Sequence, residues 1–157
     1  MNHRSLERYF LFVATVFFLL SFSGTDTSAA PSPVVATVQK LNGTATLFRQ
    51  GQTIPAKIGS EIQEYDTLRT GPDGSIGVVF SDDTLLSLGP ESVLVIDEFV
   101  FAPREGNFSL VLRMLKGTAA YLSGLISKLS PGSARFQTPS ASIGIRGTRF
   151  VVKVTGE

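Results

Sequence analysis

Carboxylates and arginines are the side chains best suited to chemistry in this 157-residue chain, because cysteine is absent and the only histidine is His3. Without either residue in the body of the chain, a Cys/His zinc site, a cysteine nucleophile and a histidine general base are excluded. The acidic pair Asp82–Asp83 could ligate a hard cation or hydrolyse a substrate, but it lacks the alternating acidic spacing of a calcium loop. Its Ser-Asp-Asp-Thr context favours a hairpin turn. We therefore expect no enzyme activity, no metal site and no cofactor.

A second group of candidates lies in the C-terminal segment TPSASIGIRGTRF (138–150). Arg146 and Arg149 flank a Gly-Thr pair, and a guanidinium can bind a carboxylate through two parallel hydrogen bonds. In one interpretation an arginine pairs with an internal carboxylate such as Asp66 or Asp97 and locks a sheet. In the other, Arg146 and Arg149 face a partner, and we name them as the binding candidates.

The same segment contains residues that shape the backbone. Pro139 fixes its own φ and holds Thr138 extended, which predicts a corner. Gly144 and Gly147 allow backbone conformations closed to other residues, or close approach by a neighbour. We expect these positions to be structural.

Residues 1–30 have the order of a secretory signal peptide: a short charged start, a thirteen-residue apolar run, and a small polar end at Ala29–Ala30. The apolar run is short for a membrane span, which needs about 20 residues. The alternative is an uncleaved anchor, the one case in which the chain would contact a membrane. The pattern predicts a periplasmic or secreted protein.

The remainder predicts a linker over 31–34 and a single domain over 35–157. Short alternating apolar runs are separated by turn residues every eight to twelve positions, which predicts an all-β antiparallel sandwich or jelly-roll-like domain. A short β-solenoid is the alternative. We expect one short helix within 123–133 and a final strand at 149–154. Removing the leader takes away two basic and two acidic residues, so the net charge stays at +1, which argues against a nucleic-acid partner.

Five motifs occur in a fixed order along nearly the whole body of the chain. They are VQKLNGTA (38–45), DTLRTG (66–71), DDTLLSLGPES (82–92), LRMLKGTAAYLSG (112–124) and TPSASIGIRGTRF (138–150). In this order they resemble the FecR domain family over about residues 35–154. The motifs add Asp66, Arg69 and Thr148 to the structural candidates.

The resemblance implies an exported, all-β, non-enzymatic domain that relays a signal in the cell envelope. About nine residues precede the apolar run, too few for a cytoplasmic sigma-factor-binding region, so the chain resembles the stand-alone exported members. We expect a protein-interaction or signalling module that binds an envelope protein, with pairing at the edge of the last strand as one route. The alternative is a structural or glycan-associated envelope protein that binds a polysaccharide through exposed aromatics, for which the candidates are Tyr65, Phe99, Phe101 and Tyr121.

Overall fold

The computed structural model describes residues 32–155. The expected signal peptide therefore falls outside the described residues. Within the described part, no helix is long and apolar enough to cross a membrane.

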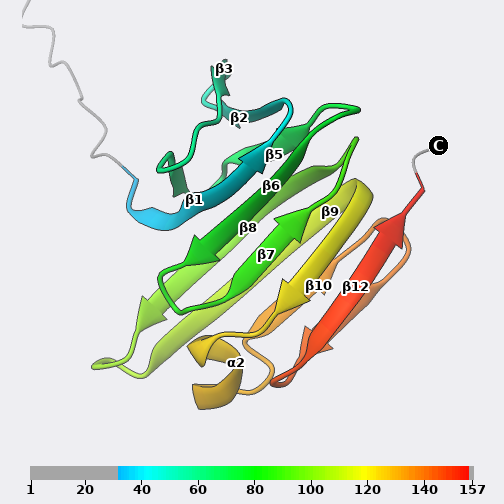
Figure 1. The fold of residues 1–157 in the computed structure, drawn as a ribbon. Coiled ribbons are helices and arrows are strands. Elements are labelled where there is room, and N and C mark those ends of the chain that lie inside the picture. The colour runs from blue at the N-terminus through cyan, green and yellow to red at the C-terminus, as the bar shows by residue number, and fades with distance from the viewer. Residues whose placement is uncertain (1–31, 156–157) are drawn as a thin grey trace, which may run out of the picture. The chain divides into compact units, whose positions relative to one another are not determined.

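The described residues form twelve strands and one helical turn (Figure 1). The strands are β1 (Val34–Asn42), β2 (Ala45–Arg49), β3 (Gln52–Pro55), β4 (Glu61–Gln63), β5 (Thr67–Thr70), β6 (Ser75–Phe80), β7 (Leu85–Leu88), β8 (Val93–Ala102), β9 (Asn107–Leu122), β10 (Ala134–Gln137), β11 (Ser142–Ile145) and β12 (Arg149–Val154). The helix α2 spans Leu125–Leu129. The expected all-β class, the helix within 123–133 and the final strand at 149–154 are confirmed.

The strands hydrogen-bond in the order β3-β2-β5-β8-β9-β7-β6-β1-β4, with β10, β11 and β12 branching from this path. The long strand β9 is the centre of the arrangement. Its first part pairs with β8 and with β10, and its last part, Gly117–Leu122, pairs with β12 and β7. Every pair is antiparallel except β9–β10. The sheet curls around a shared core in a sandwich-like arrangement.

Gly117 lies where β9 passes from one set of neighbours to the other. Its φ is +99°, and a Cβ at this position would collide with the side chain of Ser92. Ser92 Oγ accepts the N–H of Thr118 at 3.0 Å. Because only glycine fits both the conformation and the space, this position ties β9 closely to the turn before β8.

The core is built from the alternating faces of these strands. Strand β6 shows the pattern most plainly, since Ile76, Val78 and Phe80 are buried while the residues between them are partly exposed. Three aromatic rings join the C-terminal strands. The Tyr121 ring stacks on Phe150 at 5.1 Å, and Phe136 meets Phe150 edge-on at 5.4 Å. These contacts attach β12 and β10 to β9 through apolar packing.

Candidate functional site: the free edge of β12

Strand β12 forms an edge of the sheet beside the last part of β9 (Figure 1). It pairs with β9 from Arg149 opposite Leu122 to Val154 opposite Gly117, and its other side pairs with no strand among residues 32–155. An unpaired edge presents N–H and C=O groups that can bind another strand.

The register shows which backbone groups point away from β9. The Ser123 N–H donates to Thr148 O at 3.0 Å, one step before the Arg149–Leu122 pair. Hydrogen-bonded pairs alternate along an antiparallel ladder, so Phe150, Val152 and Val154 bond to β9. The backbone groups of Arg149, Val151 and Lys153 therefore lie on the free edge.

The side chains of these outward-bonding residues are also accessible. Arg149, Val151 and Lys153 are all exposed, and Val151 is 67% exposed. Neither Arg149 nor Lys153 forms a salt bridge with any described residue. The edge thus offers three backbone donors, three acceptors and two cations flanking an apolar side chain.

The strands at the other ends of the sheet are shorter or blocked. The outer side of β8 beyond Val95 also pairs with no strand in the described part of the chain, and there the Glu64 carboxylate accepts the Phe99 N–H at 3.0 Å. Strands β3 and β11 have four residues and β4 has three, against six in β12. In β3, the Ala56 N–H donates to Ala45 O, so by the same alternation Pro55 lies on the outward side of its strand. Because proline has no N–H, Pro55 cannot donate a hydrogen bond to an added strand, which disfavours pairing at the β3 edge. Strand β12 has no such block.

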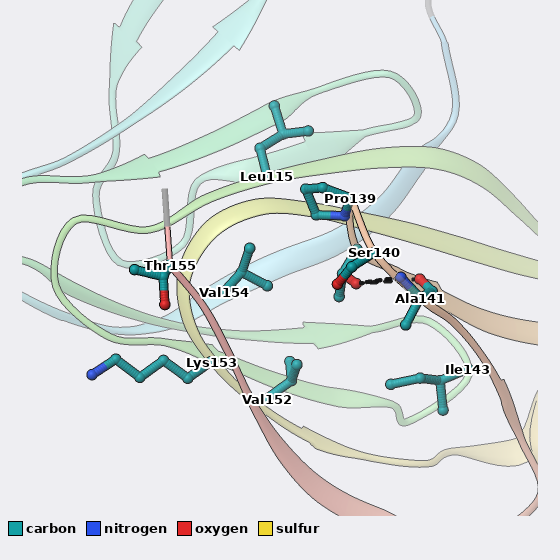
Figure 2. Close-up of a pocket in the computed structure, with 10 residues that line it drawn as sticks. Leu115, Pro139, Ser140, Ala141, Ile143, Val152, Lys153, Val154 and Thr155 are labelled. Atoms are coloured by element: carbon teal, nitrogen blue, oxygen red, sulfur yellow. Dashed lines mark hydrogen bonds between the residues drawn. The ribbon is translucent and has the colours of Figure 1, made fainter. Parts of the chain in front are cut away.

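An open groove of about 630 Å³ lies beside the inner face of β12 (Figure 2). Val152 and Val154 form one wall. The other is formed by Pro139, in the turn between β10 and β11, and by Ile143 on β11. Leu115, which is 42% exposed, also lines it. The lining combines these apolar side chains with four polar residues, Thr138, Ser140, Lys153 and Thr155, and the groove borders the free edge.

The C-terminal part of the sequence, which includes β12, carries charge of one sign. Residues 106–155 contain seven lysines and arginines and no aspartate or glutamate. Among these cations, Arg113 pairs with Asp97, and no other one forms a salt bridge with a described residue. The edge strand consequently belongs to the basic part of the sequence, and in the fold the acidic Glu91 lines a second groove together with Lys153 and Val154.

The two arginines proposed for binding lie on either side of the corner between β11 and β12, and both are exposed. The interpretation that gave one of them Asp66 or Asp97 as an internal partner is wrong. Asp66 binds Arg49, and Asp97 binds Arg113. Both carboxylates are occupied by arginines on neighbouring strands.

Asp66, a structural candidate, is completely buried. It accepts two hydrogen bonds from Arg49, and its Oδ2 also accepts the Gln63 N–H at 2.8 Å. The hydrogen bond with Asp66 raises the pKa of Arg49 above its ordinary value. This ion pair joins β2 to the turn between β4 and β5.

The remaining structural candidates occupy different places. The guanidinium of Arg69 lies 5.6 Å from the centre of the Phe48 ring, at the surface. Thr148 contributes the carbonyl that Ser123 binds. Pro139 lies in the turn between β10 and β11, where the Ala141 N–H donates to Thr138 Oγ1 at 3.0 Å. The corner expected at Pro139 is present.

Gly144 and Gly147 differ in backbone conformation. Gly147 has a φ of +60°, in the left-handed region expected to require glycine. Gly144 has no positive φ, and a Cβ there would meet nothing within 4 Å. The expectation that Gly144 serves a special backbone shape or a close approach is therefore wrong.

Asp82 and Asp83 form the expected turn between β6 and β7. Asp82 is completely buried, and its carboxylate accepts hydrogen bonds from Thr84 Oγ1 at 2.8 Å and from the Ile126 N–H at 3.2 Å. The Thr84 hydroxyl in turn accepts the Gly124 N–H. These contacts fasten the turn to the start of α2. No cluster of three or more potential metal-binding His, Cys, Asp or Glu residues occurs in the described part of the chain.

The four aromatics proposed for glycan binding do not form an exposed face. Tyr121 and Phe99 are buried, and Phe101 packs against the core. Tyr65 alone among them is exposed, at 68%. With Tyr65 as the one exposed ring among the four, these residues do not provide the exposed aromatics on which the glycan-binding alternative depends.

Sequence reasoning missed Val151 and Lys153 as candidate residues. The alternation RFVVKV predicts a strand with two faces, but it does not tell which backbone groups remain unpaired. It also missed the groove residue Leu115, because nothing near it in the sequence indicates that a turn 24 residues later would face it.

A family model described as "FecR protein" matches residues 66–157, which is more than half of the chain. The search of curated proteins and the search of solved structures each returned no match. The matched region contains the buried Asp66, the Asp82 turn, the long strand β9 and the β12 edge. The chain belongs to the FecR protein family.

Proposed function

We propose that this FecR-family domain is exported to the cell envelope and acts there as a protein-interaction or signalling module, without catalysis. The observation that carries the proposal is the free edge of β12, where the backbone groups of Arg149, Val151 and Lys153 point away from β9. An extended segment of an envelope protein would add to this edge as a further strand. The signal-peptide order of residues 1–30 supports export, and the lack of cysteine and of histidine beyond His3 supports a non-catalytic role.

Proline substitution can test the edge without disturbing the domain. Val151→Pro removes an N–H that points outward, so the β9–β12 ladder keeps its hydrogen bonds. Lys153→Pro likewise removes an outward-pointing N–H and leaves the hydrogen bonds to β9 in place. Val152→Pro would instead break a bond to β9 and is a control for unfolding. Thr53→Pro, at an outward position on the β3 edge, is the matched control for a proline on an exposed edge.

The experiment is crosslinking of the tagged full-length chain in its native cells, followed by mass spectrometry. We expect one recurring envelope protein with the unsubstituted chain and with Thr53→Pro. That protein should be lost with Val151→Pro and Lys153→Pro, whose thermal melts should match the parent chain. Recovery of the same protein with both β12 variants would overturn the proposal. Recovery of self-crosslinks or cell-wall fragments alone would favour the structural, polysaccharide-associated role.

A further inference from the structure

The chemistry of the β12 edge indicates what kind of strand it accepts. We propose, building on the function proposed above, that the partner is an extended protein segment in which acidic and apolar residues alternate. Its acidic side chains would face Arg149 and Lys153, and its apolar side chains would enter the groove of Figure 2.

The two faces of β12 differ in character. Arg149, Val151 and Lys153 share the exposed face, while Phe150, Val152 and Val154 share the face that packs on the core and lines the groove. Side chains directly opposite each other on adjacent antiparallel strands lie on the same face of the sheet. An added strand therefore places every second side chain beside the cations and the others beside the groove.

The spacing of the charges defines a pattern for the partner. Arg149 and Lys153 are four residues apart, so the partner needs two acidic residues with three residues between them. Opposite charges at facing positions stabilise a strand pair, and like charges destabilise it. The positions next to each acidic residue face Phe150, Val152 and Val154. Those that face Val152 and Val154 border the groove and must be apolar to bury against it. The pattern Val-Glu-Val-Thr-Val-Glu satisfies both requirements.

A second copy of the chain fits this edge poorly. Symmetric antiparallel pairing of two β12 strands centred on Val151 would place Arg149 of each copy opposite Lys153 of the other. Strand β12 itself carries no acidic residue that could face either cation in such a pair. The charge pattern therefore favours a different, acidic protein segment.

The groove would contribute apolar contacts to partner binding that do not depend on the two charge pairs. Its lining includes Leu115, Pro139, Ile143, Val152 and Val154, whose apolar atoms lie open to solvent on one side. Burial of apolar side chains there would stabilise the complex at any ionic strength, whereas the contribution of the two charge pairs is screened by salt. Charge and groove recognition can thus be separated by experiment.

The test measures binding of fluorescein-labelled peptides to the full chain by fluorescence anisotropy. The probes are a peptide with the core Val-Glu-Val-Thr-Val-Glu, one in which lysine replaces both glutamates, and one in which serine replaces the three valines. We expect the acidic peptide to bind about tenfold more tightly than the lysine peptide at low salt, with the difference shrinking as salt is added. The serine peptide should bind more weakly at all salt concentrations.

Substitutions in the chain should change these preferences separately. The double variant Arg149→Glu with Lys153→Glu should reverse the preference, so that the lysine peptide binds more tightly. Leu115→Gln removes an apolar groove wall and should weaken the valine peptide. Leu129→Gln, on α2 and 56% exposed, is the matched control and should leave binding unchanged.

The binding results distinguish failure of the acidic-partner proposal from failure of edge pairing at β12. Equal binding of the acidic and lysine peptides, both lost with Val151→Pro, would overturn the acidic pattern and leave edge pairing intact. Binding of the acidic peptide that survives Val151→Pro and Lys153→Pro would contradict edge pairing itself. Failure of any peptide to bind, or a chain dimer that Val151→Pro dissociates in sedimentation, would overturn the assignment of an acidic partner.

Discussion

Arg49 donates two hydrogen bonds to the buried carboxylate of Asp66, from Nε at 2.7 Å and from Nη2 at 2.6 Å. The pair formed by Arg113 and Asp97 has the same two-bond geometry, at 2.7 and 2.6 Å, but both of its side chains are partly exposed. The two pairs therefore differ mainly in their contact with water.

This difference predicts unequal effects of the same substitution. Asp66→Asn should lower the free energy of unfolding by about 3 kcal/mol, because it leaves the partly buried Arg49 without its charge partner. Asp97→Asn should cost less than about 1 kcal/mol, since water can solvate the exposed Arg113. Urea unfolding of both variants measures the two losses, and equal losses would contradict the role given to burial.

The turn at Asp82 gives a second prediction. Asp82→Asn should destabilise the domain by about 1–3 kcal/mol, because an amide NH₂ would face the donors on Thr84 and Ile126. The neighbouring Asp83 is exposed with a φ of +65°, a conformation that asparagine tolerates well, so Asp83→Asn is the matched control. Thermal melts of the two variants should differ clearly. A melt of Asp82→Asn like that of the control would show that the buried carboxylate does not fasten α2 to this turn.

The corner before β12 depends on Gly147. Gly147→Val places a β-branched residue at a φ of +60° and should destabilise the domain by at least about 1 kcal/mol. Gly144→Val should have little effect or stabilise β11 slightly, because that position has open space and valine favours strands. The comparison is made by thermal denaturation. Unchanged stability in the Gly147 variant would argue against the left-handed corner.

Tyr121 predicts a loss of stability in alkaline solution. Burial raises the pKa of its hydroxyl above the ordinary value of 10.0. This effect outweighs the nearby Thr84 and Ser127 hydroxyls, which lower the pKa, and Asp82 adds a smaller rise. Above pH 10 the unfolded chain ionises this tyrosine while the folded domain keeps it protonated, so the free energy of unfolding falls as the pH rises. Below pH 10 Tyr121 is protonated in both the folded and the unfolded chain, so it does not make the free energy of unfolding depend on pH.

Tyr121→Phe should remove this alkaline loss. At neutral pH the variant should be as stable as the parent or slightly more stable, because the buried hydroxyl has no hydrogen-bond partner among the described residues. Tyr65→Phe, at an exposed site, serves as the control and should keep the loss. Denaturant unfolding at pH 7 and at successive values above pH 10 provides the measurement. A Tyr121→Phe domain that weakens as steeply as the control would assign the loss to other groups.

Much of the local structure was predictable because it depends on neighbouring residues. The two-residue alternation of RFVVKV predicts the strand at 149–154, and the fixed φ of Pro139 predicts the corner before β11. Spacing of three and four between apolar residues predicts the short helix at α2. Each of these signals is contained in fewer than a dozen consecutive residues.

The partners of the charged residues were not predictable in the same way. Asp66 has several arginines within reach along the chain, and the pairing of β2 with β5 decides that Arg49 is the one beside it. Gly144 and Gly147 look equivalent in the sequence, yet only one adopts a positive φ. The sequence makes Tyr121 a candidate for glycan binding at the surface, whereas in the fold the rings of Phe136 and Phe150 pack against it in the core.

Composition and local periodicity are enough to predict the all-β class, the motifs of the FecR family and the final strand. The edge position of β12 and the outward N–H of Val151, rather than of Val152, follow only from how distant strands pair in the fold. The physical reason is register: a shift of one residue in the β9–β12 pairing would exchange the bonded and free backbone groups, and contacts between distant segments set that register.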